Sequence, residues 1–381
     1  MTAAGPGRAA PAAGSPSSDG GGRTVLAVDG GNSKTDVALV REDGTVLATG
    51  RGPGFLPQSA GVAAAIDVIG QTVRQALAGG GQHVRLPALH DGRPDGLPEG
   101  EGDREYGLPY ADHVAAYVAG ADLPIEEERL SDELLARGYG RTATVGNDTF
   151  ALLRAGASAP WGVAVVCGAG INAVGVAPSG QVARFPSLGR LSGDWGGGHH
   201  LGEEALWHAV RAEDGRGPAT ALTDAVLACF GTATVEDAVI RLHLGEESLD
   251  RLHDLVPPLL ATATDGDAVA MSVVKRMAEE VAVLGIVAMR RTGLLGEPCE
   301  VVLGGGVLTA GHPLLMSLIE RGYTERAPLA KLVVADVPPI VGAALLGLDR
   351  LGAPADAAER VRAHFLVSPP ARDLVSPPAR E

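Results

Sequence analysis

Residues 25–50 read VLAVDGGNSKTDVALVREDGTVLATG, and this stretch decides the fold. It holds an apolar strand, a glycine-rich turn, a second strand, a polar turn that ends in glycine, and a third strand. Residues 163–184, VAVVCGAGINAVGVAPSGQVAR, repeat the same succession. Because both copies of this β-meander are followed by helical sequence, the chain is predicted to contain a duplicated α/β domain.

The sequence around the two meanders alternates between strand and helix patterns. After the first copy, apolar residues recur at helical spacing over 60–77, and short strand patterns cover 113–118 and 141–145. Further helices are predicted at 123–137 and 149–156. After the second copy a strand is predicted at 299–303, and helices are predicted at 202–212, 219–230, 235–243, 268–291, 314–321 and 340–351.

Composition marks three segments that lack a core pattern. Residues 1–23 are almost entirely Ala, Gly, Pro and Ser, and residues 366–381 carry the string LVSPPAR twice, so both are predicted to be disordered tails. Residues 79–112 are dense in Gly, Pro, Asp and Glu, which predicts a long surface insertion.

The remaining sequence is predicted to form two lobes. Residues 24–150 form the N-terminal lobe, which contains the insertion, and residues 151–339 form the C-terminal lobe. A small-residue helix near 340–352 is expected to return and complete the N-terminal lobe.

The net charge of the chain limits the kinds of molecule that it is expected to bind. The 381 residues include 31 Lys and Arg against 46 Asp and Glu, a formal net charge of −15, which disfavours nucleic-acid binding. No apolar run approaches the roughly 18–20 residues of a membrane span, and the N-terminus lacks a secretory signal. The three cysteines are too far apart for a disulfide framework. We expect a cytoplasmic protein with a small-molecule partner, and the sequence leaves a homodimer open.

Three glycine-rich turns follow strand patterns, at residues 29–35, 168–170 and 304–306. Such turns can offer backbone N–H groups to a phosphate because no Cβ blocks the approach, although a plain hairpin or helix cap is the alternative. The chain has no P-loop string, and the second turn leads into a strand rather than a helix, which disfavours a Rossmann site. The residues predicted to bind phosphate or nucleotide are Gly30, Gly31, Asn32, Ser33, Lys34, Thr35, Gly168, Ala169, Gly170, Gly304, Gly305 and Gly306.

Several polar residues near these turns have two interpretations each. Asp29 either holds Mg²⁺ beside a phosphate or forms an Asx turn, and Lys34 either contacts a phosphate or is solvated. Asp148 is either a general base or an ordinary helix N-cap. Asp194 is a candidate for hydrogen bonds to sugar hydroxyls, and Trp195 either stacks on a substrate or is buried.

Together these strings resemble the actin-like ATPase and sugar-kinase superfamily, and more narrowly the BadF/BadG/BcrA/BcrD-type ATPase and N-acetylglucosamine kinase family. DGGNSKTDVALV and VVCGAGINAVGV resemble its two phosphate motifs, VVLGGGVL its adenosine motif and PPIVGAALLGL its second connecting helix. GNDTFALLRAG resembles the segment that carries the catalytic base, a role that falls on Asp148. VAGAD (residues 118–122) and LSGDWGGGHHLGEEAL lie where the family contacts sugar.

The resemblance implies two ribonuclease-H-like (actin-like ATPase) domains with an interlobe cleft. It further implies an ATP-dependent kinase that uses Mg²⁺, with Asp29 as the metal ligand, and phosphorylates a hydroxyl, the 6-OH, of an amino sugar such as N-acetylglucosamine or glucosamine. The implied substrate-binding residues are Gly120, Asp122, Asn147, Asp148, Asn172 and Asp194.

This chain departs from the family pattern at several positions. Ala169 and Ile171 stand where hydroxyl residues are usual, GDWGG replaces G-D-E-G-S, and Phe55 and Leu56 occupy the place of a sugar-contacting Asn, with only Gln58 nearby. The zinc-binding cysteines of the ROK-type sugar kinases are absent from the sequence. Two alternative functions remain: an ATPase activator of a radical dehydratase, and a non-catalytic sugar-binding regulator.

Overall fold

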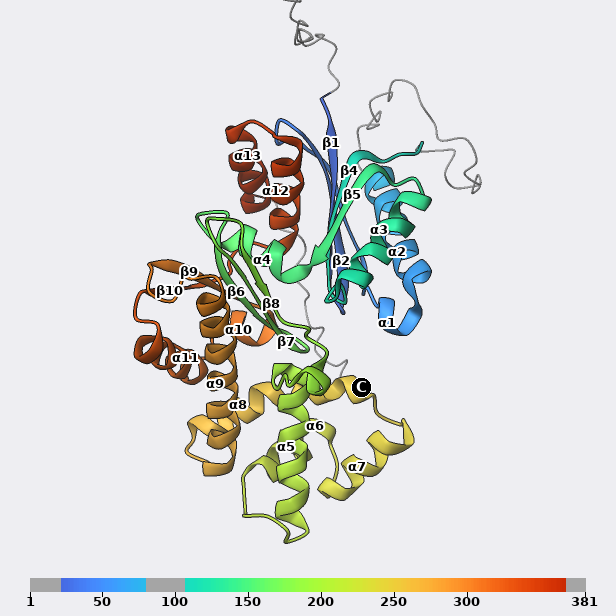
Figure 1. The fold of residues 1–381 in the computed structure, drawn as a ribbon. Coiled ribbons are helices and arrows are strands. Elements are labelled where there is room, and N and C mark those ends of the chain that lie inside the picture. Colours follow the sequence, from blue (N-terminus) through green and yellow to red (C-terminus); the bar gives the residue numbers. More distant parts are fainter. Residues whose placement is uncertain (1–21, 80–106, 368–381) are drawn as a thin grey trace, which may run out of the picture.

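Two five-stranded mixed sheets form the centre of the computed structural model, which describes residues 22–79 and 107–367 (Figure 1). The first sheet contains β1 (Thr24–Gly30), β2 (Lys34–Arg41), β3 (Val46–Pro53), β4 (Ala111–Val118) and β5 (Gly140–Asn147). Its order is β3-β2-β1-β4-β5, with β1, β2 and β3 antiparallel and β4 and β5 parallel to β1. Every residue of the central strand β1 is buried, as expected for a strand covered on both faces.

The second sheet repeats this topology. Its strands are β6 (Gly162–Cys167), β7 (Ile171–Val176), β8 (Val182–Arg184), β9 (Cys299–Gly304) and β10 (Ala330–Val334). The order is β8-β7-β6-β9-β10, again with three antiparallel strands followed by two parallel ones. The repeated order confirms the duplicated α/β fold predicted from the two meanders.

Helices cover both faces of the first sheet. One face carries α1 (Pro57–Ala60), α2 (Val62–Gly79) and α3 (Pro124–Ala136), and the other carries α12 (Pro339–Leu351) with α13 (Ala355–Val367). The C-terminal helices therefore pack on the N-terminal sheet, where apolar residues of α12 and α13 share a core with β1 and β2.

Helix α4 (Asp148–Gly156) connects the two sheets. On one side it packs against α12 so closely that a Cβ on Gly342 would lie 1.8 Å from the Ala151 carbonyl oxygen. On the other side Leu152 and Leu153 pack against the second sheet, in a core that includes Val302 of β9. The N-terminus of α4 is consequently held between the two halves of the molecule.

The second half adds a helical part below its sheet (Figure 1). Helix α9 (Ala268–Arg291) crosses β6 and β7, beside α10 (Gly306–Thr309) and α11 (Pro313–Arg326). The lower part contains α5 (Gly197–Glu213), α6 (Leu222–Phe230), α7 (Val235–Leu244) and α8 (Val256–Thr264), with the short 3-10 segments Gly189–Ser192 and Leu249–Leu255. Within the described ranges, no helix combines the length and apolar character that a bilayer crossing requires.

The structure corrects several predicted boundaries. Strand β4 begins at Ala111, inside the predicted insertion 79–112, and Leu366 and Val367 belong to α13 rather than to a tail. The predicted lobe boundary at residue 150 falls inside α4. The predictions for residues 1–21, 80–106 and 368–381 lie outside the described residues.

Helix α8, helix α13 and strand β10 were missed. Helix α8 begins with two prolines that resemble breakers, yet proline is well tolerated in a first helical turn. Helix α5 begins at Gly197 rather than at 202, because its first glycines allow close packing instead of ending the helix. A Cβ on Gly197 would lie 2.4 Å from the Ala169 carbonyl oxygen.

Candidate active site

Asp148 is the first residue of α4, at the point where β5 ends. The N-cap is Asn147, whose Oδ1 accepts hydrogen bonds from the Thr149 backbone N–H at 3.0 Å and from its hydroxyl at 2.5 Å. The interpretation of Asp148 as the N-cap is therefore wrong, and its carboxylate is free for another role. Burial raises the pKa of Asp148 to about 6, while backbone N–H groups of the first helical turn lower it.

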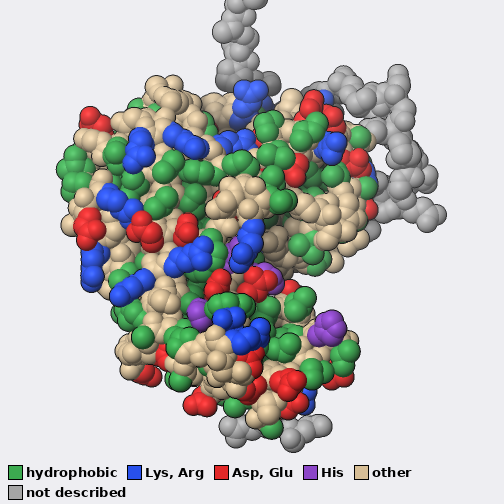
Figure 2. All heavy atoms as spheres, turned by 60° about the horizontal axis from the view of Figure 1, so that its bottom comes forward, with side chains coloured by type: hydrophobic (Ala, Val, Ile, Leu, Met, Phe, Trp, Pro, Cys, Tyr) green, Lys and Arg blue, Asp and Glu red, His purple; other side chains and the backbone are tan. Residues whose placement is uncertain are grey.

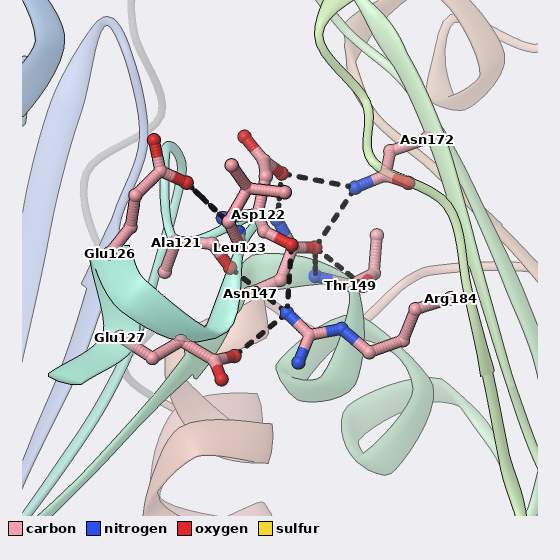
Figure 3. Close-up of polar contacts among 9 residues, drawn as sticks. All are labelled: Ala121, Asp122, Leu123, Glu126, Glu127, Asn147, Thr149, Asn172 and Arg184. Atoms are coloured by element: carbon pink, nitrogen blue, oxygen red, sulfur yellow. Dashed lines mark hydrogen bonds and ion pairs between the residues drawn. The ribbon is translucent and has the colours of Figure 1, made fainter. Parts of the chain in front are cut away.

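Three polar side chains join the two sheets next to Asp148 (Figure 3). Asn147 at the end of β5 donates from Nδ2 to Asp122 Oδ1 at 2.8 Å. Asn172 on β7 donates to Asn147 Oδ1 at 3.2 Å and reaches Asp122 Oδ1 at 3.5 Å. The three predicted sugar-binding residues Asp122, Asn147 and Asn172 thus meet, although they come from both halves of the chain.

The Asp122 carboxyl lies in a strongly acidic environment. Burial and the negative charges of Asp148, Glu126 and Asp194 raise its pKa to about 7, and Arg184 lowers it. Glu126 also caps α3 by accepting hydrogen bonds from the backbone N–H groups of Asp122 and Leu123. Acidic groups from three separate segments therefore act on Asp122, which with Asn147 and Asn172 helps to line a small pocket.

The other two predicted sugar-binding residues lie at the edges of this cluster. Asp194 contributes to the potential at Asp122 and accepts a hydrogen bond from Ser192 Oγ at 2.5 Å. Gly120 has a φ of +78°, and its carbonyl oxygen accepts a hydrogen bond from Gln58 Nε2 at 3.0 Å. Trp195 is buried, with the Arg276 guanidinium 4.1 Å from the centre of its ring. Of its two interpretations, the structure therefore favours a buried core residue over one that stacks on a substrate.

Asp29 is the penultimate residue of β1 and pairs with Asp36 of β2. It is 8% exposed, and among the described residues its carboxylate has no hydrogen-bond donor, so the Asx-turn interpretation is wrong. Burial and the charges of Asp36 and Asp148 raise its pKa to about 7. A buried carboxylate without a donor, next to other carboxylates, fits a Mg²⁺ ion, which binds proteins through one or two carboxylates and completes its shell with phosphate and water.

The two hairpin turns present similar sets of backbone N–H groups. In the β1–β2 turn, the Gly31 N–H donates to the Lys34 carbonyl at 2.8 Å, and in the β6–β7 turn the Gly168 N–H donates to the Gly170 carbonyl at 3.0 Å. Asn32 and Ser33 in one turn, and Ala169 and Gly170 in the other, are exposed residues, and their backbone N–H groups have no hydrogen-bond acceptor among the described residues. These four N–H groups are the phosphate donors that the turns can offer.

Four predicted members of the first turn differ from expectation. Thr35 is fully buried and its hydroxyl donates to the Pro53 carbonyl at 2.7 Å, so it cannot face a phosphate. Lys34 forms an ion pair with Asp36 at 3.2 Å, and Arg51 forms a second ion pair with the same carboxylate at 2.6 Å. Gly30 is buried, since a Cβ there would lie 2.8 Å from Val118. The amide of Gly31 is used within its own turn, as described above.

The glycine turn after β9 packs directly on the second hairpin. Gly305 has a φ of +85°, and a Cβ there would lie 2.4 Å from the Cys167 carbonyl. The N-terminus of α5 approaches the same hairpin, because Gly198 and His199 donate to the Gly168 and Ala169 carbonyls at 2.7 and 3.1 Å. Residues 168–170 and 304–306 are therefore neighbours in space, as a shared nucleotide site would require.

Figure 2 shows a hollow on the lower face of the molecule, with acidic, basic and histidine side chains gathered around it. Among the described residues there is no cluster of three or more His, Cys, Asp or Glu side chains suited to hold a metal ion by themselves. A metal in this site would therefore depend on nucleotide oxygens as well as protein groups.

Sequence reasoning missed Arg184, the last residue of β8. Its Nη2 donates to the carbonyl oxygens of Ala121 and Asp122, both at 3.2 Å, and pairs with Glu127 Oε1 at 2.8 Å (Figure 3). Its partners lie 57 to 63 residues away in the chain, so no local pattern signals the contact. Asp36 was also missed, because an acidic residue within a strand carries no motif of its own.

Comparison with known proteins agrees with these features. The model of the BadF/BadG/BcrA/BcrD ATPase family matches residues 26–347. The N-acetyl-D-glucosamine kinase of Dictyostelium discoideum is 24% identical over 335 residues, which is 85% of this chain and 97% of the relative. The N-acetylmuramic acid/N-acetylglucosamine kinase of Clostridium acetobutylicum is 24% identical over 257 residues, covering 67% of this chain and 76% of the relative.

A solved structure from Chromobacterium violaceum, of a proposed N-acetylglucosamine kinase, superposes with a TM-score of 0.64 at 22% identity, and covers 85% of this chain and 99% of that one. This likeness supports the duplicated actin-like ATPase fold. Because the family model matches residues 26–347, which include both hairpin turns and most of the two sheets and of α12, the protein belongs to the BadF/BadG/BcrA/BcrD ATPase family.

Proposed function

We propose that this protein transfers the terminal phosphoryl group of ATP to a hydroxyl group of an amino sugar, with the 6-hydroxyl as the acceptor. The observation that carries the proposal is the position of Asp148, whose negative charge acts both on Asp29 and on Asp122, which forms a polar cluster with Asn147 and Asn172. Asp148 is thus near both a candidate metal ligand and candidate sugar-binding groups. The names of the two curated relatives support an amino sugar as the acceptor.

In this mechanism Asp148 accepts the proton of the attacking hydroxyl. The hydroxyl oxygen forms a bond to the γ-phosphorus while the bond from phosphorus to the bridging oxygen of ADP breaks, so ADP leaves with that electron pair. A pKa of about 6 suits a general base at neutral pH, since the group is ionised yet still basic. Such assistance contributes roughly 10²–10⁴ in rate.

The remaining groups bind and orient the reactants. The exposed N–H groups at Asn32, Ser33, Ala169 and Gly170 would bind phosphate oxygens, and the turn at Gly305 would pass beside the adenosine. Asp29 would hold Mg²⁺, which when bound offsets negative charge on the phosphates. Because phosphoryl transfer needs mainly positioning and charge stabilisation, donors fixed on rigid hairpins suit this chemistry.

The amide and carboxylate groups of Asn147, Asn172 and Asp122 would hydrogen-bond sugar hydroxyls. They satisfy one another in the structure without a ligand, with donor–acceptor distances of 2.8 and 3.2 Å. A sugar hydroxyl can both donate and accept, so it can replace these contacts without leaving a buried polar group unpaired.

The role of a dehydratase activator is disfavoured by the cysteines. A cluster shared between two subunits needs accessible cysteine ligands. Cys167 and Cys299 are buried and Cys229 is half-buried, and the sequence has no others.

The test is an ADP-release assay with Mg²⁺ over glucosamine, N-acetylglucosamine, N-acetylmuramic acid, glucose and cyclitols, followed by identification of the phosphorylated carbon by ³¹P–¹H NMR. We expect sugar-dependent ADP release with an amino sugar and a 6-phosphate product. Release of ADP at the same rate without any sugar would contradict the proposal.

A further inference from the structure

Arg184 is the cationic side chain that crosses from the second sheet to the sugar-binding turn of the first. It ends β8, and its guanidinium reaches across to the loop between β4 and α3 (Figure 3). A single nitrogen, Nη2, contacts the carbonyl oxygens of Ala121 and Asp122 and the carboxylate of Glu127. The guanidinium also lies 5.5 Å from the centre of the Phe150 ring, on α4.

We propose that Arg184 is a positioning residue for sugar binding: it fixes the turn that carries Asp122, and thereby aims the Asp122 carboxylate at the sugar. This inference rests on the proposed kinase function. It assigns no contact between Arg184 and the substrate, because the carbonyl oxygens and Glu127 already occupy the nitrogen that faces the turn.

The local backbone explains why the turn needs such support. It follows β4, and Gly120 within it has a φ of +78°, a conformation that glycine adopts at little cost but that confers no rigidity. The other side-chain contacts to its backbone, among the described residues, come from its own half: Gln58 binds the Gly120 carbonyl, and Glu126 binds the Asp122 and Leu123 amides. Arg184 supplies contacts from the opposite half.

The carbonyls of Ala121 and Asp122 would otherwise be difficult to satisfy. Ala121 is fully buried, and an unpaired carbonyl there would carry a desolvation penalty. Arginine suits this position because it reaches both carbonyl oxygens and Glu127 through Nη2 while its planar guanidinium lies near the Phe150 ring, whereas a lysine ammonium is a point charge. The Arg184 and Glu127 side chains are 29% and 21% exposed, so their ion pair is partly shielded from solvent.

The proposal predicts a change in sugar binding rather than in chemistry. Hydrogen bonds to a charged group contribute more than neutral ones, so Arg184→Gln should raise the KM for the sugar about 10- to 100-fold. The KM for ATP should stay within about threefold, because the four exposed turn amides do not depend on Arg184. Glu127→Gln, which keeps the two carbonyl contacts, should raise the sugar KM by less, about three- to fivefold.

The pH profile gives a readout that a loss of stability alone would not move. The charges that face Asp122 are those of Asp148, Glu126 and Asp194, which raise its pKa, and of Arg184, which lowers it. Removing the cation should therefore shift the acid limb of kcat/KM for the sugar to higher pH. Arg184→Lys keeps the charge, so it should restore the pH profile but only part of the affinity.

The experiment compares steady-state kinetics of the full chain and its Arg184→Gln, Arg184→Lys and Glu127→Gln variants with the sugar identified in the screen. The matched control is Arg326→Gln, because Arg326 forms a two-pronged ion pair with Glu279 at 2.7 and 3.0 Å, is 34% exposed, and lies on α11 outside the polar cluster. A poorly folded variant would lose active protein and hence kcat, without a selective rise in sugar KM.

An active wild-type enzyme whose sugar KM and acid limb are unchanged in Arg184→Gln would overturn the positioning role while leaving the kinase function intact. Equal rises in the KM for sugar and for ATP would also overturn it, because the effect would not be specific to the sugar turn. A wild-type protein that phosphorylates none of the sugars would instead overturn the proposed function, and this inference with it.

Discussion

The side-chain amide of Asn172 donates a hydrogen bond to Asn147 Oδ1 at 3.2 Å, and this contact joins the second sheet to the first. Asn172 is the second residue of the hairpin strand β7, which follows a glycine-rich turn, and Asn147 caps the helix that begins with Asp148. The contact therefore couples a turn suited to phosphate with the candidate general base. Each of the following predictions tests one part of this arrangement.

Replacing Asp148 by asparagine should reduce kcat at least about 100-fold, because the amide cannot accept the proton of the sugar hydroxyl. Nucleotide affinity, measured by isothermal titration calorimetry, should stay unchanged. Asp349→Asn is a matched control. Asp349 lies on α12, outside the site, and forms an ion pair at 2.9 Å with Arg154, which is on α4 like Asp148. Near-normal turnover in Asp148→Asn would exclude Asp148 as the base.

The turnover of the wild-type enzyme should depend on pH with an apparent pKa near 6. Burial raises the pKa of Asp148 to about 6, so the protonated and inactive form predominates below this pH and the ionised base above it. We expect log kcat to fall with a slope of about one as the pH drops below 6. A kcat that stays constant down to pH 4.5 would contradict this assignment.

Asp29→Asn should stabilise the protein without metal, and more so at pH 8 than at pH 5.5. The pKa of Asp29 is raised from 3.8 to about 7 by burial and by Asp36 and Asp148, so its ionised form is unfavourable in the folded state. The stability that its protonated form contributes is lost as the pH rises through 7. After allowance for relaxation, we expect a gain of about 1–3 kcal/mol in the free energy of unfolding at pH 8.

Thermal unfolding at the two pH values measures this gain in stability. The control is Asp43→Asn, for which a change in stability of the opposite sign is expected. The Thr45 backbone N–H binds the Asp43 carboxylate at 2.9 Å and lowers its pKa, so that substitution should reduce stability slightly. Addition of Mg²⁺ with ATP should raise the melting temperature of the wild type more than that of Asp29→Asn. An equal rise in both proteins would argue against Asp29 as the metal ligand.

Gly305→Ala should destabilise the protein strongly, while Gly306→Ala should be nearly neutral. At Gly305 the φ of +85° is strained for any other residue, and a Cβ would lie 2.4 Å from the Cys167 carbonyl. A Cβ on Gly306 meets nothing within 4 Å. Backbone strain of this type costs about 1–3 kcal/mol, and the steric clash adds to it.

Chemical denaturation of the two variants compares their free energies of unfolding, and nucleotide binding by the folded fraction provides a second readout. If Gly305→Ala unfolds at the same denaturant concentration as Gly306→Ala, the close packing of the two glycine turns is not present in solution.

The duplicated fold could be predicted from the sequence because each meander carries its own pattern. Strand β1 is mainly apolar and leads into glycines, and the second copy repeats this order, so the two sheets could be recognised without knowing how they meet. Strand β10 has no such pattern: it is a short edge strand with no fully buried residue. Its pairing with β9 depends on the rest of the sheet.

The residues of the candidate site likewise fall into two groups: those whose place the sequence indicates and those whose orientation depends on packing. Asp29 lies near the end of the buried strand β1 and Asp148 directly follows β5, so the sequence indicates that both lie at strand ends, where sites on α/β folds form. Thr35 belongs to the same motif, yet the pleat turns it inward, where its hydroxyl binds the Pro53 carbonyl. The sequence places a residue in a turn, but the packed neighbours determine which of its groups remain free.

By itself, the sequence determined the repeated α/β architecture, the glycine turns and the acidic residues beside them, because local patterns of burial and turn chemistry encode these features. Only the tertiary structure decided that Asn147, Asn172 and Asp122 meet and that Arg184 supports the turn. Those contacts join residues tens of positions apart, and they exist only because α4 packs between the sheets and brings both halves together.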